Sequence, residues 1–199
     1  MAEKFIDMDS MFDSIFNKLS SPEFGENLVG ELPLYIQPFP PEHQGLIDEG
    51  VSRLIKRLER KGLSSVSINL YTFSMEILEE EGILETILED EKSIPRDDIM
   101  STLDSVLDVN ATIIPGLQER IEGANPDFVF ITGIGSVYPF LRAHAILNNI
   151  DSLTENSKLI MFFPGEYDKR QLKLFNRISD ENYYRGHNLN DITENNWLS

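Results

Sequence analysis

Apolar residues recur along the chain at the spacings of helices and strands. Within residues 7–19 they fall on one helical face, and this stripe consists of Met8, Met11, Phe12, Ile15, Phe16 and Leu19. Proline disfavours the helical conformation in the residue before it, so Pro22 limits this first helix. A second helix is predicted from Pro40 and Pro41 to Gly62, because proline is tolerated in a first turn and glycine commonly caps a helix end.

Strand and helix patterns alternate through the rest of the chain. Strands are predicted at residues 34–36, 66–71, 128–131, 159–163 and 183–189, and helices at residues 73–91 (broken at Gly82), 97–107, 117–122 and 139–150. This alternation predicts an α/β fold: a largely parallel sheet of four to five strands between helices, in a Rossmann-like three-layer arrangement. The apolar runs 128–131 and 159–163 are continuous, so we expect adjacent, parallel, central strands joined by a right-handed crossover.

A chain of 199 residues fits one domain. We expect that domain to span residues 1–189, with residues 1–31 as a helical segment packed on it and residues 190–199 as a flexible polar tail. No apolar run approaches the roughly 20 residues of a membrane span, so no membrane partner is expected, and no export signal is visible. The absence of cysteine excludes disulfides and thiolate chemistry and indicates a cytoplasmic protein.

The charge is strongly negative and unevenly distributed. The chain has 34 acidic and 17 basic residues, a net charge of -17, so direct binding to DNA or RNA is not expected. Residues 76–108 contain twelve acidic and two basic residues, whereas residues 158–185 contain six basic and four acidic ones. The acidic stretch is either a solvated helix face or a docking surface for a basic partner.

A glycine-rich segment follows the predicted strand at residues 128–131. Gly133, Gly135 and Ser136 resemble the start of a dinucleotide-binding loop, but Tyr138 stands where a third glycine would be needed. The segment therefore indicates a tight strand-to-helix turn, with nucleotide binding as the alternative.

A second loop is predicted after the strand at residues 159–163, and it contains Glu166, Tyr167 and Asp168. Ligands of such sheets bind beyond the carboxyl ends of the strands, where this loop and the glycine segment would face each other. Arg142 is predicted in the first turn of the helix at residues 139–150, where the helix dipole disfavours a cation. We expect it to bridge the two segments by pairing with Glu166 or Asp168 or with the carbonyls of the Gly133–Gly135 turn, or else to bind a ligand or a partner.

Catalytic patterns are missing from the sequence. His43, His144 and His187 are far apart, and neither a zinc-binding HExxH motif nor a GxSxG nucleophile turn is present. We therefore expect no catalytic residues, no bound metal and no cofactor.

Four motifs carry a resemblance to a known family. In order, they are Phe-Ile-Thr-Gly-Ile-Gly-Ser-Val-Tyr-Pro-Phe-Leu-Arg (residues 130–142), Phe-Phe-Pro-Gly-Glu-Tyr-Asp (162–168), Leu-Lys-Leu-Phe (172–175) and Asp-Glu-Asn-Tyr-Tyr-Arg (180–185). Together they resemble the BrxB family, a small component of bacterial and archaeal BREX phage-defence systems. The resemblance extends over nearly the whole chain and is best over residues 128–189; the acidic middle and the polar tail depart from it.

The resemblance implies a non-enzymatic accessory or scaffold protein inside a multiprotein defence complex. The family is encoded beside PglZ, an alkaline-phosphatase-like protein, so a PglZ-type protein is the expected direct partner, and a homo-oligomer stays open. No catalytic residues are established for the family. The alternative function is a nucleotide- or phosphate-binding domain, as a phosphotransfer or phosphohydrolase enzyme, that uses Gly133, Gly135 and Arg142.

Overall fold

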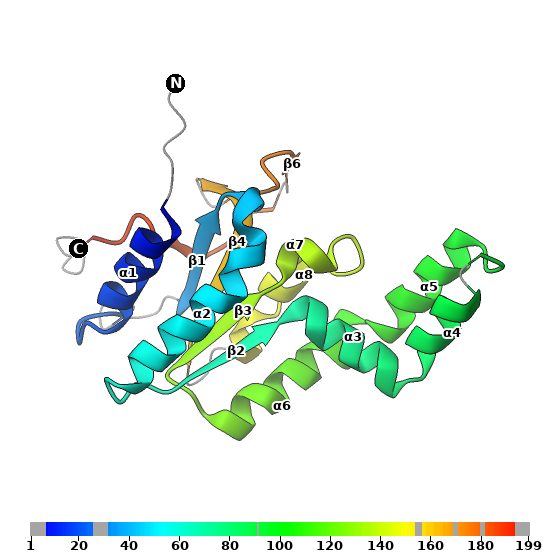
Figure 1. Cartoon of the computed structure of the whole chain (residues 1–199), viewed down its shortest axis with the longest axis horizontal. Helices are drawn as coiled ribbons and strands as arrows, with labels where there is room; N and C mark the ends of the chain where they lie inside the picture. The colour runs from blue at the N-terminus through cyan, green and yellow to red at the C-terminus, as the bar shows by residue number, and fades with distance from the viewer. Residues whose placement is uncertain are drawn as a thin grey trace.

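A computed structural model describes residues 7–25, 32–90, 92–153, 157–168, 171–179 and 182–193. It shows an α/β fold built on one mostly parallel sheet (Figure 1). Five strands form the parallel part, in the order β2-β3-β4-β1-β7, and their bounds are β1 (Leu34–Phe39), β2 (Ser65–Asn69), β3 (Phe128–Thr132), β4 (Lys158–Asp168) and β7 (His187–Asn188). The expectation for β3 and β4 is confirmed, because they pair in parallel and neither lies at an edge.

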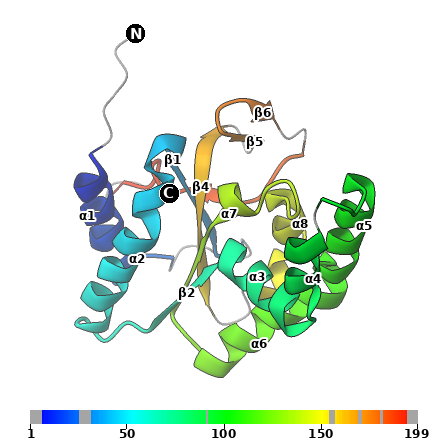
Figure 2. The ribbon, with the colours of Figure 1, turned by 45° about the vertical axis from the view of Figure 1, so that its right-hand side comes forward.

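Helices cover both faces of this sheet, which Figure 2 shows nearly edge-on. One face carries α1 (Met8–Leu19) and α2 (Gln44–Glu59), with the 3₁₀ turn η1 (Pro41–His43) before α2. The other face carries α3 (Leu70–Glu80), the π-helical turn η2 (Val109–Ile113), α6 (Ile114–Ala124), α7 (Ile134–Val137), α8 (Ala143–Leu147) and the 3₁₀ turn η3 (Ile150–Leu153). Between α3 and η2, α4 (Ile83–Asp90) and α5 (Arg96–Val106) extend beyond the sheet (Figure 1). The predicted three-layer α/β arrangement is therefore confirmed.

The alternation of side chains along the central strands divides the core in two. Phe128 and Phe130 of β3 pack with α1 and α2, whereas Val129 and Ile131 pack with the helices of the opposite face. All four side chains are at most 2% exposed. This double burial explains why the apolar run of β3 is unbroken.

The order of the strands determines where the connections leave the sheet. The chain crosses from β1 through α2 to β2, and then returns through β3 to β4, which lies beside β1. Crossovers of this kind are right-handed, so the outward and return connections place their helices on opposite faces. The starts of α2 and α7 consequently lie on either side of the carboxyl end of β4.

The structure corrects the helix predicted at residues 139–150. Only Ala143–Leu147 are α-helical in this region, and Arg142 precedes them in an extended conformation, with φ -102° and ψ 140°. Proline both opens and closes helices, and here Pro139 closes one, because Tyr138 before it is extended and ends α7. Arg142 therefore occupies the N-cap position of α8 rather than a first helical turn.

The segment predicted as a loop at residues 164–168 is also corrected. These residues continue β4, which pairs in an antiparallel manner with β5 (Gln171–Leu174), and β5 pairs with β6 (Ile178–Ser179). The hairpin extends the sheet beyond the predicted four to five strands, to seven in the described residues. Pro164 and Gly165 suggested a turn, but the strand passes through both of them.

Three further strands differ in length from their predictions, and one of them is β2, which ends at Asn69 because α3 begins at Leu70. β1 continues through Pro38 to Phe39. The carbonyl of Ile36 accepts a hydrogen bond from the N–H of Leu189, on the β7 side of β1. Pro38, two residues later, faces the same side but lies beyond the end of β7, so no strand partner needs an N–H there. Proline is tolerated where no strand partner needs its missing N–H. The strand predicted at residues 183–189 is reduced to His187–Asn188.

Parts of the predicted N-terminal segment and of the predicted tail lie outside the described residues. α1 packs against α2, but residues 1–6 and 26–31 of the predicted N-terminal segment lie outside the described part, as do residues 194–199 of the predicted tail. The division of the chain at residues 1–189 stays a prediction.

Candidate functional site

A crevice lies at the carboxyl edge of the parallel sheet, where ligands of such folds bind. It has a volume of about 200 Å³ and lies between the start of α2 and the start of α7. Its floor includes Phe162 and Pro164 of β4. The crevice is thus the point at which neighbouring connections leave the sheet on opposite faces, and it contains the predicted glycine segment.

The two glycines of this segment allow close packing. Gly133 has a φ of 75°, and a Cβ atom there would overlap the Oδ1 atom of Asn69. A Cβ atom at Gly135 would overlap Oε1 of Gln44 and lie 3.0 Å from Pro164. The prediction of a tight strand-to-helix turn is confirmed, and so is the expectation that this turn meets the segment after Phe163. The chain's own side chains occupy the space in front of both glycines.

Ser136 joins the two sides of the crevice. The Nε2 atom of Gln44, in α2, donates a hydrogen bond of 2.6 Å to the Ser136 hydroxyl, in α7. This hydroxyl is exposed, but its bond to Gln44 links the two helices.

Asp48 organises the polar floor of the crevice. Its carboxylate accepts hydrogen bonds from the Thr132 hydroxyl (2.6 Å) and from Nδ2 of Asn69 (2.8 Å). The Oδ1 atom of Asn69 in turn accepts from the backbone N–H groups of Tyr71 and Thr72, and so caps α3. α2, β3 and the start of α3 are therefore held together by side chains that all find partners within the chain.

Sequence reasoning missed both Asp48 and Asn69. Asn69 carried a usable signal, because asparagine directly before a helical pattern is a favoured N-cap, although we predicted it inside a strand. Asp48 gave no such signal, because it is one of several polar residues along α2 and nothing in the local pattern distinguishes it. Only the strand order brings it against β2 and β3.

The electrostatics of the crevice do not favour an anion. Its described lining residues include the Asp48 carboxylate and no lysine or arginine. A phosphate placed there would face this negative charge without a cation to balance it. Within the described residues, no three His, Cys, Asp or Glu side chains are arranged to hold a metal ion.

The predicted bridge between Arg142 and the second segment is wrong. Arg142 is exposed, and no hydrogen bond or ion pair joins its side chain to another described residue. Glu166 instead lies 3.5 Å from the Nζ atom of Lys173, its cross-strand neighbour. The cause is the continuation of β4, whose alternation turns Glu166 and Asp168 outward to solvent.

The same alternation turns Tyr167 inward, where it has a structural role. Its side chain is 6% exposed, and its hydroxyl contacts the carbonyls of Gly186 (2.8 Å) and Tyr184 (3.1 Å). Nδ2 of Asn188 donates to the Tyr167 carbonyl at 3.0 Å. Tyr167 therefore anchors the segment that leads into β7.

Tyr138, the remaining predicted site residue, packs edge-on against Phe175 with ring centroids 6.4 Å apart. The predicted site residues thus separate into three groups. Gly133, Gly135 and Ser136 lie in the crevice, and Tyr138 and Tyr167 pack in or on the core. Arg142, Glu166 and Asp168 are exposed, and Arg142 forms no ion pair with either carboxylate.

Comparisons with known proteins agree on one family. The model of the family described as "BREX protein BrxB" matches residues 66–189. A BREX protein BrxB from Bacillus cereus (strain H3081.97) is 34% identical over 190 residues, which cover 92% of this chain and 98% of that protein. A BREX protein BrxB from Escherichia coli O9:H4 (strain HS) is 24% identical over 159 residues, covering 80% and 78% of the two chains. No solved structure gives a significant match.

Proposed function

The chain belongs to the BrxB family of BREX phage-defence systems, and from this we propose that it is a non-catalytic accessory protein that acts through protein–protein contacts. Its proposed direct partner is a PglZ-type protein of the same system, and its proposed location is the cytoplasm, with which a chain that contains no cysteine is compatible. None of the helices in the described part of the chain combines the length and the hydropathy that a bilayer crossing requires.

The observation that carries this proposal is the state of the crevice. At the edge of the sheet where enzymes of similar topology hold their ligands, the side chains of Asn69 and Gln44 lie directly against Gly133 and Gly135. The carboxylate of Asp48 is engaged with Thr132 and Asn69. These contacts hold the fold together, which supports a structural rather than a catalytic use of this edge.

The outer surface gives further support for a role in contacts. In Figure 1, α4 and α5 project from the body as a helical arm, and this arm belongs to the acidic stretch of residues 76–108. Leu88 of α4 is 68% exposed. An acidic projection that carries an exposed leucine suits a basic partner surface better than it suits a small ligand.

The alternative, a nucleotide- or phosphate-binding enzyme, is less well supported. It would need donors and a cation around the Gly133–Gly135 turn, but the described lining contributes the Asp48 carboxylate and no basic side chain. Arg142, the cation that we expected to serve this site, does not line the crevice.

Co-expression with the PglZ-type protein encoded in the same system tests the proposal. We expect the two proteins to co-elute from a size-exclusion column as a complex of defined stoichiometry, and the isolated chain to leave ATP, GTP and p-nitrophenyl phosphate unchanged. Separate elution at micromolar concentrations would reject the partner. Turnover of any of these substrates that is lost in an Asp48→Ala or Ser136→Ala variant would reject the non-catalytic role and favour the alternative.

A further inference from the structure

A second cavity lies on the other side of α7, between the segment that joins α7 to α8 and the β5–β6 hairpin. Its volume is about 290 Å³. Its apolar wall consists of core side chains, namely Ile134, Leu141, Phe163, Leu172 and Leu174. We call this cavity the hairpin pocket.

The size and lining of the hairpin pocket limit what it can hold. Sites for drug-sized ligands occupy about 300–1,000 Å³, so a cavity of about 290 Å³ is small for a nucleotide and suited to an apolar side chain. The wall formed by core residues is apolar, and the polar side chains in the rest of the lining are those of Tyr138, Arg142, His144, Ser179 and Asn182. A pocket with an apolar interior and few polar groups binds one end of its ligand by burial and orients the other by hydrogen bonds.

Arg142 supplies the charge at this pocket. Its side chain lines the cavity, is exposed and is not paired with another described residue. It also stands at the N-cap of α8, where its own charge gains nothing from the helix.

Ile178 adds an unusual feature to the hairpin side of the pocket. It lines the cavity and is 41% exposed. Its strand, β6, pairs only with β5 within the described residues, so one edge of β6 has no strand partner. An exposed isoleucine on an open edge, next to an apolar cavity, is typical of a surface that a peptide segment covers.

We propose that the hairpin pocket binds a segment of a partner protein, with an apolar side chain inside the cavity and a carboxylate of the same segment on Arg142. This proposal specifies the contact surface for the function proposed above and rests on that function. The acidic partner group follows from charge complementarity. Among the described residues that line the pocket, Arg142 is the one lysine or arginine, and a guanidinium holds a carboxylate in a bidentate, charge-assisted manner.

Model peptides test the chemistry on the isolated chain. In an extended segment alternate side chains point the same way, so the probe is acetyl-Gly-Phe-Ser-Glu-Gly-amide, compared with its Glu→Gln and Phe→Ala forms. We expect saturable shifts of the methyl NMR signals of Leu174 and Ile178, and an affinity about fivefold higher for the glutamate than for the glutamine peptide. The alanine peptide should bind too weakly to saturate.

Variants of the chain assign these effects to Arg142. In Arg142→Ala the glutamate and glutamine peptides should bind equally, and Arg142→Lys should recover only part of the preference, because an ammonium lacks the bidentate geometry. Arg177→Ala is the matched control, since Arg177 is an exposed cation of the same hairpin that does not line the pocket. The proposal is overturned by equal binding of the two peptides to the natural chain, by shifts that map elsewhere, or by no binding.

The PglZ-type protein provides the second measurement. We expect Arg142→Ala, and Ser179→Trp at the pocket rim, to weaken its binding about fivefold or more, and Arg177→Ala to leave it unchanged. If the natural chain binds PglZ and all these variants bind equally well, the pocket proposal fails while the contact function stands. If the peptides behave as expected but PglZ does not bind, the partner assignment fails and the pocket stands.

Discussion

At the scale of single residues, Asp48 has the largest structural role in the crevice. It is exposed to solvent on one side, yet its carboxylate accepts the hydroxyl hydrogen bond of Thr132, a side chain that is only 1% exposed. A buried hydroxyl that loses its acceptor destabilises the folded state, because its desolvation is no longer offset by a hydrogen bond. The stabilising effect of Asp48 therefore depends on the burial of Thr132.

Asp48→Ala should lower the free energy of unfolding by about 1–3 kcal/mol, because it leaves the Thr132 hydroxyl without an acceptor. Asp48→Asn keeps one carbonyl oxygen for that hydroxyl and should cost less. Urea unfolding followed by circular dichroism measures both variants. Equal stability of the alanine variant and the natural chain would show that water replaces the carboxylate.

Gly133 tests the tight turn. Its φ of 75° and the nearby Asn69 side chain exclude a Cβ atom, so Gly133→Ala should destabilise the fold by more than about 1 kcal/mol. Gly45→Ala is the control, because Gly45 lies in α2 with nothing within 4 Å of its would-be Cβ atom. That change should be neutral or stabilising by up to about 1 kcal/mol. The prediction fails if the two variants have the same melting temperature.

Tyr35 makes stability depend on pH in the alkaline range. Burial raises the pKa of its phenol, whereas the unfolded chain should ionise it near its reference pKa of about 10. The folded state keeps the proton longer, so the contribution of Tyr35 is complete below about pH 10 and is lost as the pH rises further. In Tyr35→Phe the loss of stability between about pH 9 and 11 should therefore be shallower.

Urea titrations across this pH range measure the slope, and Tyr183→Phe is the control because Tyr183 is 73% exposed. An unchanged slope in Tyr35→Phe, or an equal change in Tyr183→Phe, would contradict the assignment.

At the scale of elements, patterns with one interpretation were predicted well and ambiguous ones were not. The unbroken apolar runs of β3 and β4 predicted that both strands are buried on both faces and therefore central. The crossover that joins them predicted that they are adjacent and parallel. Gly82 correctly separated α3 from α4. The sequence pattern predicted that Pro139 begins a helix, but proline also ends helices. Only the packing of α7 decides between a helix start and a helix end.

The candidate site was predictable to a smaller degree. The glycine turn followed from local chemistry, since a positive φ favours glycine. The contacts of Arg142 depended on whether residues 164–168 form a loop or a strand, and that depends on the later residues of β5, with which they pair. The contacts of Asp48 with Asn69 and Thr132 depended on the order of the strands. Contacts between distant segments cannot be derived from local patterns, whereas turns often can.

The arm formed by α4 and α5 allows a test of the two interpretations of the acidic stretch. Glu85 and Glu89 lie four residues apart on α4, and both are exposed. Like charges at this spacing repel each other, so Glu89→Lys should raise the stability by about 0.3–0.5 kcal/mol through a new pair with Glu85.

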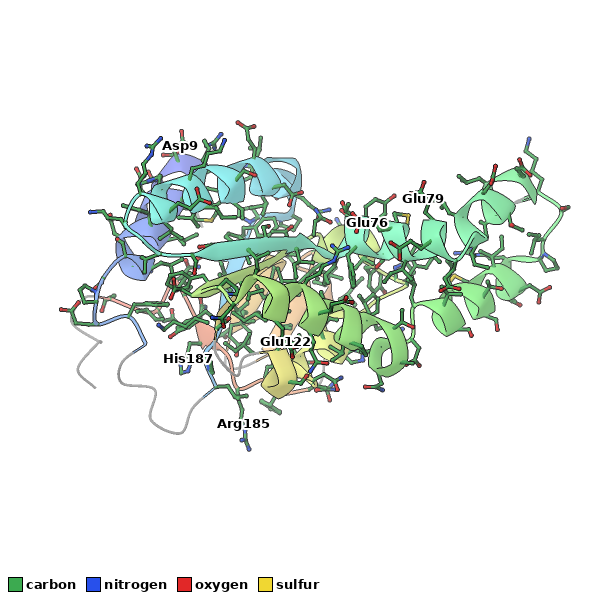
Figure 3. The ribbon with its side chains drawn as sticks, turned by 90° about the horizontal axis from the view of Figure 1, so that it is seen from below. Asp9, Glu76, Glu79, Glu122, Arg185 and His187 are labelled. Atoms are coloured by element: carbon green, nitrogen blue, oxygen red, sulfur yellow. The ribbon has the colours of Figure 1, made fainter. Side chains whose placement is uncertain are left out.

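If the arm contacts a basic surface, the same variant should bind the PglZ-type protein more weakly despite its higher stability. Glu122→Lys, on α6 outside the arm (Figure 3), is the matched control for net charge. Calorimetry of the chain and of the complex gives both quantities. Unchanged binding in Glu89→Lys would favour the solvated helix face.

At the scale of the whole molecule, the distribution of charge separates two sides. Figure 3 shows Glu76 and Glu79 on α3, from which the arm continues, and Arg185 projecting on another side of the body. The side with α3 to α5 belongs to the stretch with twelve acidic residues, and the hairpin to the stretch with six basic ones. The charge is thus unevenly distributed over the molecule, which suits a protein that contacts components of different charge in a complex.

The net charge of -17 also determines how the isolated chain meets DNA. Binding to a duplex depends on basic side chains that neutralise phosphates and release counterions, and each such contact weakens as salt rises. Here the basic clusters are short: residues 53–61 hold five basic residues and one acidic one, and residues 158–185 hold six basic and four acidic ones, in a chain with 34 acidic residues. We therefore expect no measurable affinity for a 30-base-pair duplex at physiological salt in a fluorescence anisotropy titration. Adding the PglZ-type protein controls for DNA binding by the complex, and micromolar, salt-sensitive binding by the chain alone would refute the expectation.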